Sequence, residues 1–143
     1  MARTAERGLF DMLFSADTQS AWTAEGEGMR RQHYVAWLEP FCLMSALSGY
    51  TRNIGLASTA TTTYEEPYSL ARRFATLDLV SGGRGGWNVI TSGNPTEAQN
   101  FGRDVHADKV DRYKRAREFV QVVSGLWDSW DDDALVLDRE TGY

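Results

Sequence analysis

The sequence is short of the residues that build disulfides, metal sites and membrane spans. Its one cysteine, Cys42, excludes an internal disulfide framework. Its two histidines, His33 and His106, are far apart and have no cysteine or carboxylate at a metal-binding spacing. No apolar run approaches the roughly 18 residues that a membrane-spanning helix needs. We therefore expect neither a metal site nor a membrane partner.

The sequence also has fewer basic than acidic residues. Lysine and arginine number 15 against 20 aspartates and glutamates, which gives a net charge of -5. A nucleic-acid surface needs an excess of positive charge, so nucleic acid is not expected as a partner. The first ten residues, MARTAERGLF, lack the apolar stretch of a signal peptide, and a cytoplasmic location is the default expectation. No nucleophile elbow or other hydrolase motif is present.

What the sequence does contain is an alternation of short apolar strands and amphipathic helices. A chain of 143 residues is long enough for one domain with its own core. Runs of apolar and β-branched residues predict strands at 11–16, 54–60 and 87–91. A polar loop is expected at 17–36. Helical periodicity, prolines at first turns and glycines at ends predict helices at 2–8, 38–49, 67–81 and 108–127.

This order predicts an α/β fold with a parallel sheet and right-handed crossovers. Three strands cannot close a barrel. The first and third strands both have the apolar character of central strands, yet at least one must lie at an edge. The chain is therefore interpreted as a piece of a larger fold. In the last helix, residues at steps of three and four predict a buried stripe: Val110, Tyr113, Ala116, Val120, Val123 and Trp127.

The segment SGGRGG, residues 81–86, could be a phosphate-binding loop or a turn. A phosphate loop follows a strand and opens a helix, because the helix amino terminus supplies free N–H groups. This segment instead closes a helix and opens a strand, which predicts a helix cap and tight turn. In a β/α fold it would lie at the stabilising edge, so functional groups are expected at the opposite edge, at 16–18, 60–63 and 90–92.

Several segments, in a consistent order, resemble the flavin-dependent monooxygenases of the bacterial luciferase-like family. The resemblance is nearest to the nitrilotriacetate monooxygenase and dibenzothiophene-sulfone monooxygenase type. It is carried by GLFDMLFSAD (8–17), WLEPFCLMSALSGYTRNIGLAS (37–58), ATTTYEEPYSLARRFATLDLVSGGRGGWNVITS (60–92), NFG (100–102) and DRYKRAREFVQVVSGLWDSWDDDAL (111–135).

The resemblance implies an incomplete TIM (β/α)8 barrel, with roughly strands two to four and their helices. Residues 1–143 would then be a single segment of that barrel domain, truncated at both ends. It also implies reduced FMN as cofactor, supplied by a separate flavin reductase, with dioxygen and a small organic substrate. A deazaflavin-dependent oxidoreductase is disfavoured by the motifs TTTYEEPY and GWNVITS. The protein is expected to be a homo-oligomer.

The same resemblance supplies candidate flavin contacts. Asp17 matches a flavin-contacting aspartate, and a carboxylate at a barrel mouth can accept hydrogen bonds from the flavin ring or ribityl chain. A cap for the following loop is the other interpretation of Asp17. Among Thr61, Thr62 and Thr63 we favour Thr62 and then Thr63, although each could equally be a β-branched strand end.

Two further candidates are Asn88 and Tyr113. The amide of Asn88, within an apolar strand, needs a partner, which could be a flavin edge or a side chain of a neighbouring strand. Tyr113 matches a tyrosine that helps hold the flavin phosphate. Relatives often have a histidine one helical turn earlier, where this sequence has Lys109; His106 is a possible substitute. The competing hypothesis is a non-catalytic barrel segment that self-associates through open sheet edges.

Overall fold

The computed structural model describes residues 1–21, 27–31, 37–131, 133–134 and 136–142. Three strands form one parallel sheet in the order β1-β2-β3: Met12–Ser15, Gly55–Thr61 and Gly85–Ile90. β2 lies in the centre, with Phe14 opposite Ala57 and Thr59 opposite Asn88. The predicted parallel sheet is confirmed. Both strands with central character lie at its edges, as far as the described residues extend.

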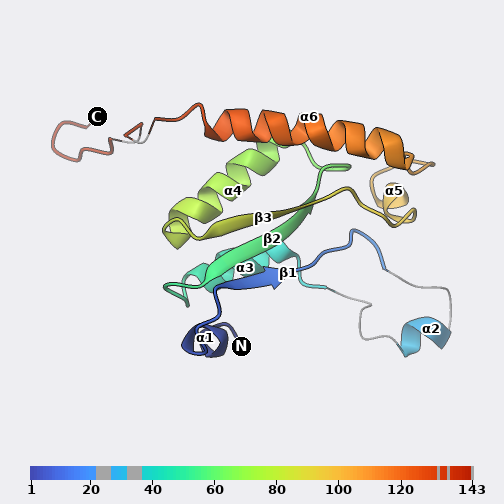
Figure 1. Cartoon of the computed structure of the whole chain (residues 1–143), viewed down its shortest axis with the longest axis horizontal. Helices are drawn as coiled ribbons and strands as arrows, with labels where there is room; N and C mark the ends of the chain where they lie inside the picture. The colour runs from blue at the N-terminus through green and yellow to red at the C-terminus, as the bar shows by residue number, and fades with distance from the viewer. Residues whose placement is uncertain (22–26, 32–36, 132, 135, 143) are drawn as a thin grey trace.

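Six helices are described around this sheet (Figure 1): α1 (Ala2–Arg7), α2 (Glu27–Arg30), α3 (Pro40–Ser48), α4 (Pro67–Ser81), α5 (Glu97–Asn100) and α6 (Lys109–Trp127). Prolines stand in the first turns of α3 and α4, as predicted. The carboxylate of Glu39 caps α3, and that of Asp108 caps α6. Within the described ranges no helix is long and apolar enough to cross a membrane.

The core lies between the sheet and the helices on one side of it. α3 and α4 pack against β2 and β3, and α6 packs across α4 (Figure 1). The buried cluster draws on β2, these three helices and the turn before β2: Met44, Ile54, Leu56, Ala60, Leu70, Ala71, Phe74, Leu77, Phe119 and Val123. On β1, by contrast, Met12 is 54% exposed and Phe14 is 52% exposed. Alternation along the strands places these two side chains on the face away from the helices.

The predicted buried stripe of α6 is only partly correct. Val110 and Tyr113 are 76% and 57% exposed, whereas Ala116, Phe119 and Val123 are buried. The physical reason is that the amino terminus of α6 extends beyond α4, so α4 does not cover the first two turns of α6 (Figure 1). Periodicity identified the helix but could not show where its neighbour ends.

Three smaller differences concern short elements. α5 was not predicted, and its four residues are too few for a periodic signal. α2 interrupts the predicted polar loop 17–36, of which 22–26 and 32–36, including His33, lie outside the described residues. β3 begins two residues before the predicted start because Gly85 and Gly86 pair with β2.

The glycine-rich segment forms the predicted helix cap and turn. Gly82 closes α4 with φ 73°, in the left-handed region that glycine adopts without steric cost. The Arg84 side chain then turns back across the amino edge of the sheet. Its guanidinium donates to the carbonyls of Ser48, Thr51, Ile54 and Ser81 and to the Thr51 hydroxyl, at 2.7–3.2 Å. One cation therefore joins the end of α3, the turn before β2 and the end of α4 at this edge.

Replacing Arg84 should weaken the whole fold. Because Arg84→Ala leaves several carbonyls without a donor, we expect the free energy of unfolding to fall by about 3 kcal/mol, measured by urea denaturation. Arg72→Ala, on the exposed side of α4, is the control and should change it by no more than about 0.5 kcal/mol. An unchanged urea midpoint for Arg84→Ala would show that these bonds do not hold the edge.

Candidate functional site

The carboxyl ends of the three strands lie together with α5 and the amino terminus of α6 at one side of the molecule (Figure 1). Parallel strands bring these ends to a single edge, and side chains that follow them can converge there. Asp17 follows β1, Thr62 and Thr63 follow β2, and Ser92 follows β3. The sequence prediction that this edge collects the polar candidates is consistent with the geometry.

Asp17 is half-buried just beyond β1. Gln19 Nε2 donates to its Oδ2 at 2.9 Å. Burial raises the pKa of the Asp17 carboxyl above its ordinary value, and the negative charges of Glu39, Glu97 and Glu65 raise it further. A hydrogen bond from the Thr18 backbone N–H opposes this rise in pKa only in part. Glu39, Glu65 and Glu97 follow β1, β2 and β3 respectively, so the segments after all three strands contribute negative charge at Asp17.

The threonines at the end of β2 are buried and hydrogen-bonded. The Thr62 hydroxyl donates to the Ile90 carbonyl at 3.1 Å, and the Thr63 hydroxyl donates to the Thr91 carbonyl at 2.7 Å. Thr61 Oγ1 accepts bonds from the Thr63 N–H and the Ser92 hydroxyl. By strand alternation Thr61 lies on the helix-free face, together with Thr59 and Asn88, and Thr62 does not.

Asn88 has its partner on the neighbouring strand. Its Nδ2 donates to Thr59 Oγ1 at 3.0 Å, and the Thr59 hydroxyl donates in turn to the Ser15 carbonyl at 2.7 Å. The two bonds form a polar ladder that crosses all three strands on the helix-free face. The neighbouring side chain that Asn88 was expected to meet is therefore Thr59, and the ladder fixes the amide near the carboxyl edge.

Tyr113 and Lys109 stand one turn apart at the start of α6. Tyr113 is 57% exposed, and Lys109 Nζ lies 5.9 Å from the centroid of its ring. His106, the suggested substitute for a histidine at position 109, makes contacts of its own. It lies before α6, where its ring nitrogens meet the Tyr64 hydroxyl and the Ser92 carbonyl. The start of α6 therefore carries the Lys109 ammonium and the Tyr113 phenol, in place of the histidine and tyrosine of relatives.

Sequence reasoning missed Glu97, the first residue of α5. Its side chain is 2% exposed, and Oε1 accepts from the Thr18 hydroxyl at 3.3 Å. Oε2 is buried without a hydrogen-bond partner among the described residues. A buried carboxylate oxygen without a donor is costly, which is typical of functional regions. No pattern in NPTEAQN distinguishes this glutamate from an exposed one, so its burial could not be predicted.

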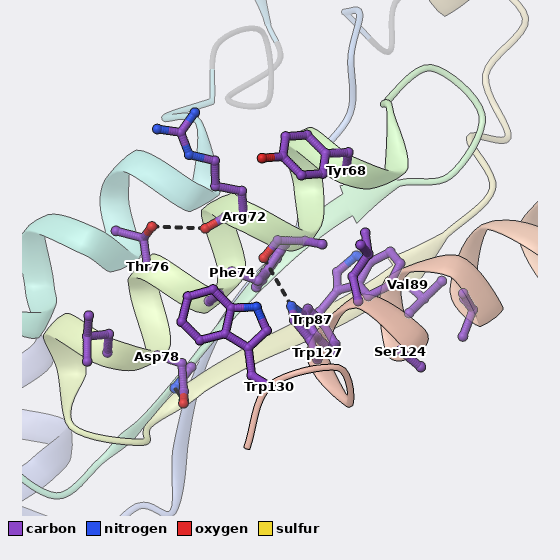
Figure 2. A pocket seen from close by; sticks show the side chains of 16 residues that line it. Tyr68, Arg72, Phe74, Thr76, Asp78, Trp87, Val89, Ser124, Trp127 and Trp130 are labelled. Atoms are coloured by element: carbon purple, nitrogen blue, oxygen red, sulfur yellow. Dashed lines mark hydrogen bonds between the residues drawn. The ribbon is translucent and has the colours of Figure 1, made fainter. Parts of the chain in front are cut away.

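A second hollow of the described residues lies away from this edge. A groove of about 1000 Å³ runs between α4, β3 and α6 on the helix-covered side, and Trp87, Trp127 and Trp130 stand around it (Figure 2). The Trp87 and Trp127 indoles donate to backbone carbonyls at 3.0 Å. The groove is mostly apolar and contains none of the polar groups of the carboxyl edge. We therefore assign the candidate site to the carboxyl edge.

A family model described as luciferase-like monooxygenase matches residues 1–140. The chain belongs to this family. The N-acetyl-S-(2-succino)cysteine monooxygenase of Bacillus subtilis (strain 168) is 49% identical over 99% of the chain and 31% of its own length. Nitrilotriacetate monooxygenase component A of Aminobacter aminovorans is 48% identical over 99% and 33%. Dibenzothiophene-sulfone monooxygenase of Rhodococcus erythropolis is 47% identical over 99% and 32%.

Solved structures of the luciferase-like family agree with the fold. A long-chain alkane monooxygenase superposes with a TM-score of 0.87 at 36% identity, over 99% of this chain and 34% of that one. A riboflavin lyase with modified FMN and riboflavin superposes with a TM-score of 0.84 at 35% identity, over 97% and 32%. The predicted resemblance to the nitrilotriacetate and dibenzothiophene-sulfone monooxygenase type is confirmed, and so is the predicted partial barrel. The chain spans about a third of the relatives that it matches.

The raised pKa of Asp17 in this luciferase-like segment predicts the sign of a stability change. A carboxyl whose pKa is higher in the folded state disfavours folding once it ionises, so stability is lost as the pH rises through that pKa. Asp17→Asn should therefore melt at a higher temperature than wild type at pH 7. The difference should vanish below the ordinary value of 3.8.

Asp11→Asn, at the exposed amino end of the same strand, is the matched control for thermal melting across this pH range. It should track wild type throughout. A lower melting temperature for Asp17→Asn at pH 7 would mean that the Asp17 charge stabilises the fold, against the burial argument.

Proposed function

We propose that the protein containing this segment is an FMN-dependent monooxygenase. It would use reduced FMN and dioxygen to oxygenate a small organic substrate. The observation that supports this proposal most directly is the convergence of Asp17, the threonines of β2, Asn88 and Ser92 at the carboxyl edge of a parallel sheet. In β/α barrels that edge holds the active site.

The donors and acceptors of this edge suit a flavin. The half-buried Asp17 carboxylate could accept from the ring N3–H or a ribityl hydroxyl. Asn88 lies on the helix-free face of the sheet, where a planar ring can lie against the backbone. The buried Thr62 and Thr63, which donate to the carbonyls of Ile90 and Thr91, would fix the adjoining ends of β2 and β3. Lys109 and Tyr113 would meet the phosphate at the start of α6, with Lys109 acting as a point charge. The buried Oε2 of Glu97 adds an acceptor that has no partner among the described residues.

Bound reduced FMN would supply the electrons and the position that reacts with dioxygen. The protein groups would orient the flavin and keep water from it. Asp17 would fix the ring or ribityl chain, and the three-strand ladder through Asn88 and Thr59 would hold the surface on which the flavin rests. A separate flavin reductase is the expected source of reduced FMN, as a transient partner, and the names of relatives favour a small-molecule substrate.

The competing function is a non-catalytic segment that self-associates. Two observations favour it. Met12 and Phe14 expose apolar surface on the helix-free face, and β1 and β3 each have one edge without a strand partner among the described residues. Unprotected strand edges promote association between chains. Size-exclusion chromatography measures this directly: assembly without flavin binding supports the competing function, and a flavin-binding monomer contradicts it.

The first prediction of the proposal is saturable binding of reduced FMN by the 143-residue chain. Titration under anaerobic conditions, followed by flavin absorbance and fluorescence, should give a dissociation constant that rises about tenfold or more in Asp17→Ala. The expected size follows from a hydrogen bond to a charged group, worth about 1.5–3 kcal/mol.

Asp11→Ala removes a carboxylate from the exposed amino end of β1 and should bind flavin as wild type does. Equal affinity in Asp17→Ala and Asp11→Ala would exclude Asp17 from the site. Absence of binding in wild type would reject flavin function for this segment.

A further inference from the structure

Ser92 holds an unfavourable backbone conformation at the exit of β3. Its φ is 51°, in the left-handed region that residues with a Cβ seldom adopt. A buried residue in this conformation is held there by contacts with its surroundings. Ser92 is 2% exposed, so any groups that fix it belong to the protein interior.

Two contacts hold Ser92, one through its side chain and one through its carbonyl. Its hydroxyl donates to Thr61 Oγ1 at 2.7 Å, which ties it to the end of β2. Its carbonyl is 3.1 Å from His106 Nε2, in the segment before α6. Ser92 therefore joins the end of the central strand to the approach to the last helix.

The hydrogen-bonding capacity of these partners selects one tautomer of the neutral His106 ring. A carbonyl oxygen only accepts hydrogen bonds, so Nε2 must carry the proton that reaches Ser92. In the neutral ring Nδ1 is then an acceptor, and the Tyr64 hydroxyl lies 2.5 Å from it as the donor. The direction of donation runs from Tyr64 to His106 to Ser92.

Tyr64 is itself held in place. Its ring stacks on that of Phe101 with a centroid distance of 4.4 Å and an interplanar angle of 2°. The Arg103 guanidinium lies 5.5 Å from the ring centroid. The phenol comes directly after Thr61–Thr63 in the chain, so the relay begins and ends at the candidate flavin edge.

We infer that Tyr64 and His106 are positioning residues for the flavin site, which hold Ser92 in its left-handed conformation and thereby fix the Ser92 and Thr61 hydroxyls at the sheet edge. The inference rests on the proposed flavin function. Neither residue needs to touch the flavin. Their effect passes through Ser92, whose conformation sets the path from β3 into the loop that carries α5.

The relay can be tested without flavin. The chain has two histidines, and His33→Gln assigns the ring signals of His106 in ¹⁵N NMR spectra. At mildly alkaline pH we expect one tautomer, with a slowly exchanging Nε2 proton and an unprotonated Nδ1. In Tyr64→Phe, which retains the ring stack, Nδ1 loses its donor and its ¹⁵N shift should change. A fast-exchanging mixture of tautomers in wild type would overturn the relay.

The positioning role is tested by flavin titration of His106→Ala, His106→Gln and Tyr64→Phe. We expect about a tenfold loss of affinity for reduced FMN in His106→Ala and a smaller loss in Tyr64→Phe. His106→Gln keeps an amide donor for the Ser92 carbonyl, so it should recover most of the affinity. Tyr68→Phe, which removes an exposed hydroxyl from α4, is the control and should bind as wild type does.

Arg84→Ala separates positioning from simple loss of stability, because it destabilises the opposite edge of the sheet. Measured well below its melting temperature, it should retain wild-type flavin affinity while His106→Ala does not. Equal affinity in wild type and His106→Ala would overturn the inference and leave the flavin proposal intact. Failure of wild type to bind flavin would reject both the flavin proposal and this role, whereas the NMR result would still report on the relay.

Discussion

The structure depends on the burial of β2 between two parallel neighbours. Leu56 and Ala60 face the helices and enter the core, whereas Thr59 and Thr61 face the opposite side and are nonetheless 2% and 0% exposed. A buried hydroxyl must be hydrogen-bonded. Thr59 therefore bonds to Ser15 and Asn88, and Thr61 bonds to Ser92 and Thr63. The contacts that satisfy the central strand are the same contacts that build the candidate site.

Local patterns predicted the sheet and the four longer helical segments because their causes are local. Apolar runs and β-branched residues indicate strands, and Pro67 and Gly82 mark the two ends of α4 by backbone preference alone. The exposure of Val110 and Tyr113 could not be predicted in this way. It depends on where α4 ends beneath α6, which is a relation between elements rather than a property of either sequence.

The residues of the candidate site likewise fall into those that local patterns predict and those that depend on contacts between loops. Asp17, Thr62, Thr63 and Asn88 could be assigned to one edge because the ends of parallel strands coincide. Tyr64 and His106 are 42 residues apart, and their contact follows from how the loop after β3 folds back. Glu97 is a comparable case, since its burial is imposed by the loop after β1. The spacing of residues along the sequence does not indicate such contacts, which are seen only in the folded structure.

The two edges of the sheet differ in how completely they are satisfied. At the amino edge glycine takes the left-handed position after α4, and Arg84 supplies donors to four carbonyls. At the carboxyl edge a serine takes a left-handed position, a carboxylate is half-buried among other acids, and a buried Glu97 oxygen has no partner among the described residues. Unfavourable features of this kind persist where function requires them. Left-handed non-glycine residues stand at both edges, Leu9 before β1 and Ser92 after β3, so strain alone does not separate the two. What separates them is the half-buried Asp17 carboxyl with its raised pKa and the buried Glu97 oxygen, and these mark the carboxyl edge as the candidate site.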